Sequence, residues 1–315
     1  MSDSIATDVR APIGTRLYPR WHQRPAIRYQ GTVRQLRRVL PRFERRSGFQ
    51  GKHEIIGKSP WKPDRQIIVG SVSPQYVLVQ HEEFLDVLAA VMSEEGYDLE
   101  NMPGILTTTN YGERMELTVE MTAFANTPSD GYPLECRLRC LNSVDATTAL
   151  EAELQWYRKI CSNGMFGWKG DSVRHIHRYN NAMDWLKDRL ARRFEDLPND
   201  RLYFSQLMDI PVSDNNLKDW VDVFIARQWS RFDAARTYQI CMTGRDGYAF
   251  DYDDDRAAHE LEFRSGEDVP GACAPARNVY HVGQALSWVA GTAGTVEKQF
   301  SQTSAIPKLL RHLLK

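Results

Sequence analysis

The middle of the chain alternates apolar and polar residues with a period of two. The alternation runs through residues 104–110, 114–124, 134–143 and 149–161, and turn-forming residues separate these segments. Side chains on a strand point to opposite faces in turn, so each segment predicts a strand with one apolar and one polar face. The short connections favour antiparallel neighbours. We therefore predict an antiparallel β-meander with one core face and one solvated face, whose mixed Glu and Arg side chains form cross-strand ion pairs.

Other regions follow a helical period. Residues 81–96 place Phe84, Leu88 and Val91 on one face and end at Gly96, which predicts a helix. After the meander, the apolar spacing predicts a long helix from residue 172 to residue 196, ended by Pro198. Further helices are expected at residues 216–230, 277–290 and 306–314.

The first 80 residues give weaker patterns. Residues 1–30 hold three prolines and little periodicity, which predicts irregular structure, and residues 32–46 predict a short amphipathic helix interrupted by Pro41. Residues 59–63 read as a loop, and residues 66–79 as two short strands broken at Pro74.

These elements together predict an α+β fold, an antiparallel β-meander packed by helices with a mainly helical C-terminal third. We divide the chain into a basic N-terminal arm with a short helix (1–65), an α+β core of meander and long helix (66–200) and a mainly helical region (201–315).

Charge is distributed unevenly along the chain. The formal net charge is −1, yet residues 1–65 contain fifteen basic and five acidic side chains, a net charge of +10. The remaining residues therefore carry −11. A basic arm on an acidic body predicts either a footprint for a polyanion or an arm that docks on its own body, and the sequence leaves both open.

Composition predicts a cytoplasmic protein. The five cysteines are widely spaced in a chain too large to need disulfide bonds, which fits a reducing compartment. The first residues have no apolar core of a signal peptide, and no stretch has the roughly 18 apolar residues of a membrane helix. We expect no membrane association.

The sequence offers few candidates for a catalytic or metal site. Cys136 and Cys140 lie on one predicted strand, about 13 Å apart and too far to share one ion. Cys161 with His175 and His177 is a looser possibility, as a metal site or as a thiolate and its base, but Cys161 ends an apolar strand. We expect no metal and no cofactor, and we identify no catalytic residue. Whether Cys161 and His175 meet stays open.

The acidic run at residues 246–255 lacks the spacing of a calcium loop, so a solvated turn between two strands is expected. A metal-dependent enzyme built on Asp251–Asp255 with His259 and Glu260 remains an alternative. No glycine-rich phosphate-binding motif is present.

Nucleic-acid binding fits the basic segments better. Single-stranded nucleic acid is bound by cations that meet its phosphates and by aromatic rings on which its bases stack. Two segments interleave such residues, with solvated charge as the alternative explanation. They supply Arg16, Arg20, Trp21, Arg24 and Arg28 in the arm, and Arg158, Lys159, Trp168, Lys169, Arg174, His175 and Arg178 after the meander.

Three central blocks resemble a known family. NSVDATTAL (residues 142–150), RKICSNGM (158–165) and VRHIHR (173–178) are similar to signature blocks of the phage- and plasmid-borne family called domain of unknown function 932. Two flanking pieces agree, VSPQYVLVQHEEFLDVL (72–88) and NVYHVGQALSWVA (278–290). The resemblance covers residues 66–290. The residues that carry the signature are Asn142, Asp145, Cys161, Asn163 and Gly164.

The chain departs from that family pattern at two places. The His-Asp-Gly of the pattern is Val144-Asp145-Ala146 here, and a late Asn corresponds to His281. The resemblance implies a protein of phages, plasmids or integrated elements in a prokaryotic cytoplasm, without implying a reaction. We expect residues 158–161 to close the meander, residues 162–164 to turn the chain, and Arg174 and His175 to lie at the entrance of the long helix, where an anion is favoured.

A meander followed by a long helix is also similar to the architecture of single-strand annealing proteins, which is an analogy of fold alone. The sequence thus predicts a non-enzymatic protein that binds single-stranded DNA in recombination or replication and assembles as a homo-oligomer. A protein that inhibits a host defence or replication protein, with its acidic body as a nucleic-acid mimic, is the alternative from another class.

Overall fold

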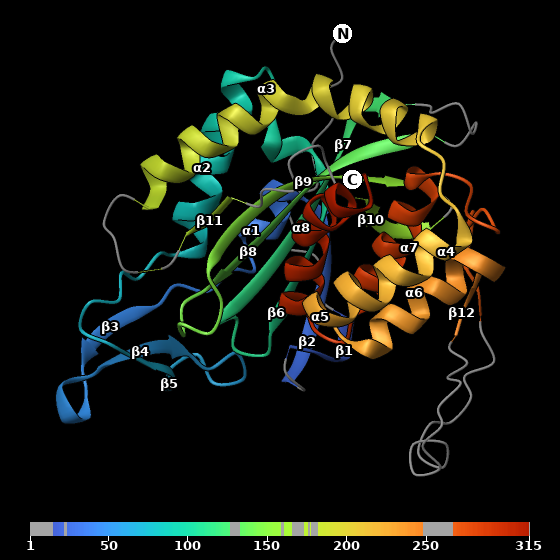
Figure 1. The fold of residues 1–315 in the computed structure, drawn as a ribbon. Coiled ribbons are helices and arrows are strands. Elements are labelled where there is room, and N and C mark those ends of the chain that lie inside the picture. The colour runs from blue at the N-terminus through green and yellow to red at the C-terminus, as the bar shows by residue number, and fades with distance from the viewer. Residues whose placement is uncertain are drawn as a thin grey trace, which may run out of the picture. The chain divides into compact units, whose positions relative to one another are not determined.

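The computed structural model describes residues 15–21, 24–126, 133–158, 161–165, 173–175, 177, 182–247 and 267–314 of the chain. The fold is α+β, with antiparallel sheets and a helical C-terminal part, as the sequence predicts (Figure 1). The chain forms two compact units. The first, unit 1, comprises residues 1–121, 137–154 and 172–195, and the second, unit 2, comprises residues 122–136, 155–171 and 196–315.

The predicted meander is confirmed. Its strands are β6 (Pro103–Thr109), β7 (Arg114–Asn126), β8 (Leu134–Ser143) and β9 (Leu150–Arg158), and they are neighbours in this order. Buried Leu117, Val119 and Met121 share one face of β7, which the alternation of the sequence requires.

The opposite face is not simply solvated. Glu116 on β7 and Arg139 on β8 form the expected cross-strand ion pair, with Arg139 Nη2 2.6 Å from Glu116 Oε1, and both side chains are buried. Glu153 on β9 is buried as well. The prediction of a wet face is therefore wrong at these positions, because the charges that suggested solvent neutralise one another inside the protein.

Two N-terminal strands extend the sheet. β1 (Thr15–Trp21) pairs with β2 (Arg24–Thr32), and β2 pairs antiparallel with β6 from Ala26 opposite Thr109 to Thr32 opposite Pro103. The prediction of irregular structure for residues 1–30 is wrong over these strands. β2 forms because it is hydrogen-bonded to a strand more than 70 residues away, and no local period in the sequence predicts such pairing.

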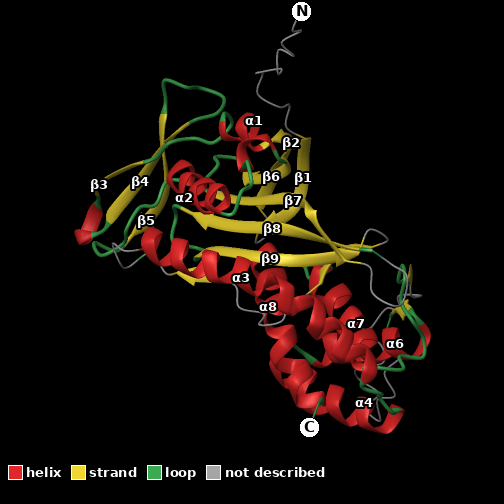
Figure 2. Ribbon diagram, turned by 90° about the horizontal axis from the view of Figure 1, so that it is seen from above, coloured by secondary structure: helices red, strands yellow, loops and turns green. Residues whose placement is uncertain are grey.

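A smaller sheet joins β3 (Glu44–Ser47), β4 (His53–Lys58) and β5 (Gln66–Val72) in that order, as Figure 2 shows. The preceding helix α1 is only Val33–Arg37, shorter than the predicted 32–46, and a turn η1 (Phe49–Gly51) connects β3 to β4. Of the two strands expected in residues 66–79 only β5 forms. A hydrophobic cluster lies beside this sheet and contains Phe43, Ile55, Val72, Tyr76 and Val144.

Helix α2 (His81–Glu94) confirms the prediction for residues 81–96, and a turn η2 (Leu99–Asn101) follows it. Gln80 and Glu83 cap its first turn reciprocally. Buried Phe84, Leu88 and Val91 form the apolar face that the spacing predicts.

The region after the meander differs from expectation. β10 (Cys161–Met165) and β11 (Val173–His175) both pair with β9, so residues 162–164 form a strand and not the predicted turn. Arg174 and His175 lie in β11 and not at a helix entrance, because helix α3 begins at Ala182.

Helix α3 (Ala182–Asp209) also continues through Pro198, where the sequence predicted an end. Proline removes one main-chain hydrogen bond, which costs a helix roughly 3 kcal/mol. Burial of the following turn offsets that cost, because Phe204 and Leu207 are buried and Trp156 Nε1 donates to Asp200 Oδ2 at 2.8 Å.

The C-terminal helices pack on one another, and Figure 2 shows α4, α6, α7 and α8 gathered together. The predictions at 216–230, 277–290 and 306–314 are confirmed in outline, whereas α6 was missed. None of the described helices combines the length and the apolar character needed to cross a lipid bilayer. The elements are α4 (Asp214–Trp220), the π-helical turn η3 (Val221–Ile225), α5 (Ala226–Gln228), α6 (Arg231–Thr243), the paired strands β12 (Arg245–Asp246) and β13 (Glu267–Asp268), α7 (Val279–Gly291) and α8 (Val296–Leu313).

Candidate functional site

Three of the sequence blocks that carry the resemblance meet in unit 1 as a buried polar group. Residues 72–88 supply Tyr76 and His81, residues 142–150 supply Asn142 and Asp145, and residues 173–178 supply His177. Arg114, at the start of β7, completes the set. We call these six residues the signature cluster.

His81 is held between two partners at the first position of α2. Its Nε2 lies 2.8 Å from the carbonyl oxygen of Gly112 and its Nδ1 lies 3.0 Å from Asn142 Nδ2. The carbonyl oxygen only accepts and the amide nitrogen only donates, so the proton resides on Nε2. Burial lowers the pKa of His81 to about 4, and the imidazole is therefore neutral at physiological pH.

Asn142 connects this imidazole to the segment before α2. Its Nδ2 donates to the carbonyl oxygen of Val79 at 3.1 Å as well as to His81. Tyr76 continues the connection, since its hydroxyl donates to the carbonyl oxygen of Ser143 at 2.9 Å. Burial and the nearby Asp145 charge raise the pKa of Tyr76, which keeps the hydroxyl protonated.

Asp145 shapes the loop that follows β8. Its Oδ2 lies 3.1 Å from Arg114 Nε, and both side chains are only 3% exposed. Its Oδ1 accepts from the main-chain nitrogen of Thr147 at 3.1 Å and from the Thr147 hydroxyl. Between them Ala146 has φ +61°, in the left-handed region that favours glycine. The methyl group of Ala146 therefore lies at a position whose backbone conformation favours glycine.

His177 fixes the third block. Its main-chain oxygen accepts from Val77 N at 2.8 Å, its Nδ1 lies 3.2 Å from the carbonyl oxygen of Val77, and its ring stacks on Tyr76 with 5.0 Å between centroids. The segment VRHIHR is thus attached to the chain just before α2.

The turn between β6 and β7 supplies the partners that sequence reasoning missed. Gly112, with φ +71°, offers its carbonyl oxygen to His81, and Thr109 Oγ1 both accepts from Arg114 N and donates to Glu113 Oε2. This stretch was predicted as a turn between two strands, without a role in a site. The available signal in the sequence was an adjacent pair of opposite charges, Glu113-Arg114, between this turn and an apolar strand; the structure shows that both are buried.

The signature cluster stabilises the fold and is not exposed to a substrate. His81 and Asn142 are 0% exposed, and both imidazole nitrogens of His81 are engaged. A general base needs a free nitrogen within reach of the proton that it removes, and His81 offers none. Among the described residues no group of His, Cys, Asp and Glu side chains is arranged to hold a metal ion.

The predicted nucleic-acid residues fall mainly on strands. Arg28 is exposed on β2, and Trp21 and Arg24 are paired positions of the β1–β2 hairpin. Arg16 and Arg20 lie on β1, Arg158 on β9, and Arg174 and His175 on β11, each as a backbone position. Outside the described residues lie Lys159, Trp168, Lys169, Arg178 and the acidic residues 251–255 with His259 and Glu260.

The expected gathering at one joint is wrong for Arg158 and Arg174, whose backbone positions the structure describes. Arg158 belongs to one end of β9, whereas Arg174 pairs with Glu151 near its other end, seven residues or about 23 Å away along the strand. The same register separates Cys161, opposite Arg158, from His175, opposite Leu150. Those positions are eight residues or about 26 Å apart along β9, so Cys161 and His175 do not form a catalytic pair. Asn163 and Gly164 accompany Cys161 on β10.

Part of the basic arm docks on its own body. Arg37 lies 2.7 Å from Asp86 on α2 and 2.7 Å from Glu100, and Arg42 lies 2.6 Å from Glu82. Of the two expectations for the arm, self-docking therefore applies to Arg37 and Arg42.

The loop between β4 and β5 is different. We call residues 58–66 the Trp61 loop. The Trp61 side chain is 59% exposed and meets Tyr111 edge to face, with 5.4 Å between ring centroids. Main-chain bonds from Ser59 N to Arg65 O and from Arg65 N to Lys62 O hold the loop in one shape.

The same loop carries three cations. Lys58, Lys62 and Arg65 are exposed, and within the described part of the chain none of their side chains has a carboxylate partner. The acidic member of the loop is Asp64. A loop was predicted at residues 59–63, but its pattern of a tryptophan between lysines, followed by an arginine, was missed. That pattern joins a stacking surface to phosphate-binding charge.

The family model described as Domain of unknown function (DUF932) matches residues 68–293, more than two thirds of the chain, including the whole signature cluster. No curated protein and no solved structure matches the chain. The chain belongs to the DUF932 family.

Proposed function

We propose that this protein binds single-stranded nucleic acid, with DNA favoured, and does not break bonds in it. Its setting would be the prokaryotic cytoplasm, in the recombination or replication of a phage or plasmid. The observation that carries the proposal is the Trp61 loop, where an exposed aromatic pair adjoins three cations without carboxylate partners among the described residues. Exposed aromatic rings stack with nucleic-acid bases whatever the base sequence, and unpaired cations attract the phosphates.

The ordered state of the loop supports this role. A ring held in place loses little conformational freedom when a base stacks on it, so its area contributes to affinity. Trp61 is held by the loop's main-chain bonds and by Tyr111, which belongs to the same turn as Gly112, just before Arg114 on β7. The signature cluster thus fixes one side of a turn whose other side meets Trp61.

In this proposal the arginines of the arm supply further phosphate contacts. Arg16, Arg20, Arg24 and Arg28 occupy β1 and β2 at the edge of the large sheet. Assembly as a homo-oligomer remains a prediction, which light scattering with and without an oligonucleotide checks.

The proposal is tested by fluorescence anisotropy of the full chain with labelled single-stranded DNA, duplex DNA and RNA over a series of salt concentrations. We expect the single strand to bind best and its affinity to fall as salt rises. Trp61→Ala should weaken binding by about 5- to 150-fold, the equivalent of ~1–3 kcal/mol for one stacked base. Replacing Lys58, Lys62 and Arg65 by Ala should reduce the slope of log K against log salt by about 2.

A matched control removes the same charge elsewhere. Lys218, Arg192 and Arg231 are exposed, and their replacement by Ala should leave the affinity almost unchanged. Absence of binding at low salt, or equal binding by wild type and both loop variants, contradicts the proposed function.

A further inference from the structure

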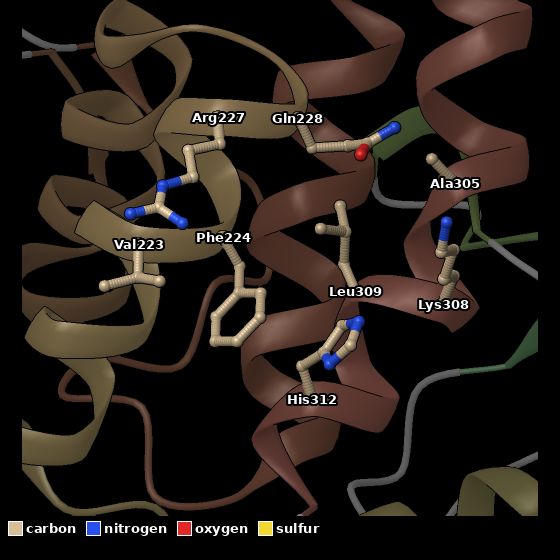
Figure 3. Close-up of a pocket in the computed structure, with 8 residues that line it drawn as sticks. All are labelled: Val223, Phe224, Arg227, Gln228, Ala305, Lys308, Leu309 and His312. Atoms are coloured by element: carbon tan, nitrogen blue, oxygen red, sulfur yellow. The ribbon is translucent and has the colours of Figure 1, made fainter.

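A pocket in the C-terminal helices has the composition of an anion site. It lies between η3–α5 and α8 and has a volume of about 210 Å³. Figure 3 shows Leu309 and the Phe224 ring near its centre, Arg227 on one side and Lys308 on the other. The eight residues that line it are Val223, Phe224, Arg227, Gln228, Ala305, Lys308, Leu309 and His312.

The charge of this pocket is uncompensated. Arg227 and Lys308 are exposed, and within the described residues neither forms an ion pair. No Asp or Glu lines the pocket. Two cations on opposite sides of a concave surface attract an anion, and arginine fits the oxygen atoms of a phosphate with several donors at once.

The floor of the pocket is apolar and aromatic. Leu309 is 3% exposed, and the Phe224 ring stacks on the His312 imidazole with centroids 4.5 Å apart and planes 13° from parallel. An apolar cavity of about 150 Å³ is large enough to bind benzene, so this volume accepts a flat heterocycle. Inorganic phosphate would leave such a floor unused.

One wall of the pocket departs from regular α-helix geometry, and the other contains a proline. Val223 and Phe224 belong to a π-helical turn, a form that is rare and often found at functional sites. The facing helix α8 contains Pro307 next to Lys308. Trp220 Nε1 donates to the carbonyl oxygen of Leu309 at 3.2 Å, which fixes the floor against α4.

We propose that this pocket binds a nucleoside phosphate, with the base against Phe224, His312 and Leu309 and the phosphate between Arg227 and Lys308. Gln228, whose amide is directed across the pocket in Figure 3, offers a hydrogen-bonding group to the base edge. The nucleotide is either free or one unit of a strand. The second source rests on the proposed function, and the first does not.

Isothermal titration of the full chain with deoxyadenosine 5′-monophosphate tests the site, with deoxyadenosine and inorganic phosphate as partial ligands. We expect the nucleotide to bind at least tenfold more tightly than either partial ligand. The double variant Arg227→Ala, Lys308→Ala should lose about tenfold or more in affinity, since hydrogen bonds to charged groups are strong. Phe224→Leu should weaken the nucleotide several-fold and leave the binding of phosphate unchanged.

Controls separate this site from the Trp61 loop and from unfolding. Lys218→Ala with Arg231→Ala removes the same charge from other exposed positions of the helical unit and should bind the nucleotide as wild type does. Trp61→Ala should also leave nucleotide binding intact, so the two proposals fail separately. Equal thermal midpoints show that the variants are folded.

The source of the nucleotide follows from the same double variant. If it also loses affinity for single-stranded DNA, the pocket takes a unit of a strand; if only the free nucleotide is lost, the ligand is the free form, and both results support the site. No binding of the nucleotide, binding that the double variant retains, or phosphate bound as tightly as the nucleotide overturns the proposal.

Discussion

The signature cluster and the Trp61 loop lie in the same unit, but charged side chains are buried and paired in the cluster and exposed in the loop. Arg114 and Asp145 are buried against each other, whereas Lys58, Lys62 and Arg65 are exposed without a carboxylate partner among the described residues. Charges that are buried and paired must stay paired, because either partner alone would remain desolvated. The difference teaches that the buried polar residues of the signature cluster stabilise the fold, while the exposed residues of the Trp61 loop form the proposed binding surface.

The largest effect should follow from breaking the buried pair. Asp145→Ala leaves Arg114 without its carboxylate and should lower the free energy of unfolding by about 3–5 kcal/mol in urea denaturation. Asp268→Ala is the matched control, because it removes an exposed pair with Arg245 and should cost less than about 1 kcal/mol.

A double variant makes this test sharper. Arg114→Met together with Asp145→Ala removes both charges and should recover part of the lost stability. If Asp145→Ala and Asp268→Ala lower the free energy of unfolding equally, the buried pair contributes no more to stability than the exposed pair.

A pH effect should distinguish His81 from exposed groups. Its pKa is about 4 in the folded protein and about 6.5 in the unfolded chain. The unfolded chain therefore binds a proton more readily between these values, and the free energy of unfolding should fall as pH decreases from 6.5 towards 4. The full loss is on the order of 3 kcal/mol.

Chemical denaturation at several pH values measures this loss. His81→Gln, which has no titrating ring, should show a shallower slope across the window, although other carboxyl groups titrate in both proteins. Parallel slopes for the two proteins would exclude a buried neutral His81 as their cause.

A smaller gain should come from the loop of the signature cluster. Ala146→Gly removes a methyl group from a left-handed backbone and should raise the free energy of unfolding by roughly 0.5–1 kcal/mol, after the greater freedom of unfolded glycine is subtracted. Ala235→Gly in α6 has the opposite expectation, a loss of about 1 kcal/mol. The thermal midpoints of the two variants should move in opposite directions.

The smallest effect on stability is expected at the Trp61 loop. Replacing Lys58, Lys62 and Arg65 by Ala should change the free energy of unfolding by no more than about 0.5 kcal/mol, because exposed unpaired side chains contribute little to the fold. A marked loss of stability in this variant would show that the loop cations stabilise the fold as the signature cluster does, which contradicts the comparison.

The fold was predictable where order is local. The meander and α2 follow from periods of two and of 3.6, since each segment buries its own apolar face. β1 and β2 could not be foreseen, because their order depends on pairing with β6. α3 crosses Pro198 because Phe204 and Leu207 are buried beyond it, which no local rule includes.

The candidate site was predictable only in part. Asn142 and Asp145 stood out in the sequence, but their partners His81 and Arg114 lie about 61 and 31 positions away and are defined only by packing. Arg158 and Arg174 were predicted to form one cationic surface because they are near each other in the sequence. The register of β9 places them near opposite ends of that strand. Adjacency along a chain is a poor guide when both segments pair with one long strand.

Gly70 on β5 links the two regions compared above. A Cβ atom at this position would lie 2.9 Å from the Cα atom of Asp145, closer than any side chain tolerates, and the obstacle is backbone. The strand that follows the Trp61 loop is therefore seated directly on the loop of the signature cluster. Transferring β4, the Trp61 loop and β5 to another scaffold would therefore require the loop that contains Asp145 to be transferred with them. Even Gly70→Ala should separate β5 from that loop.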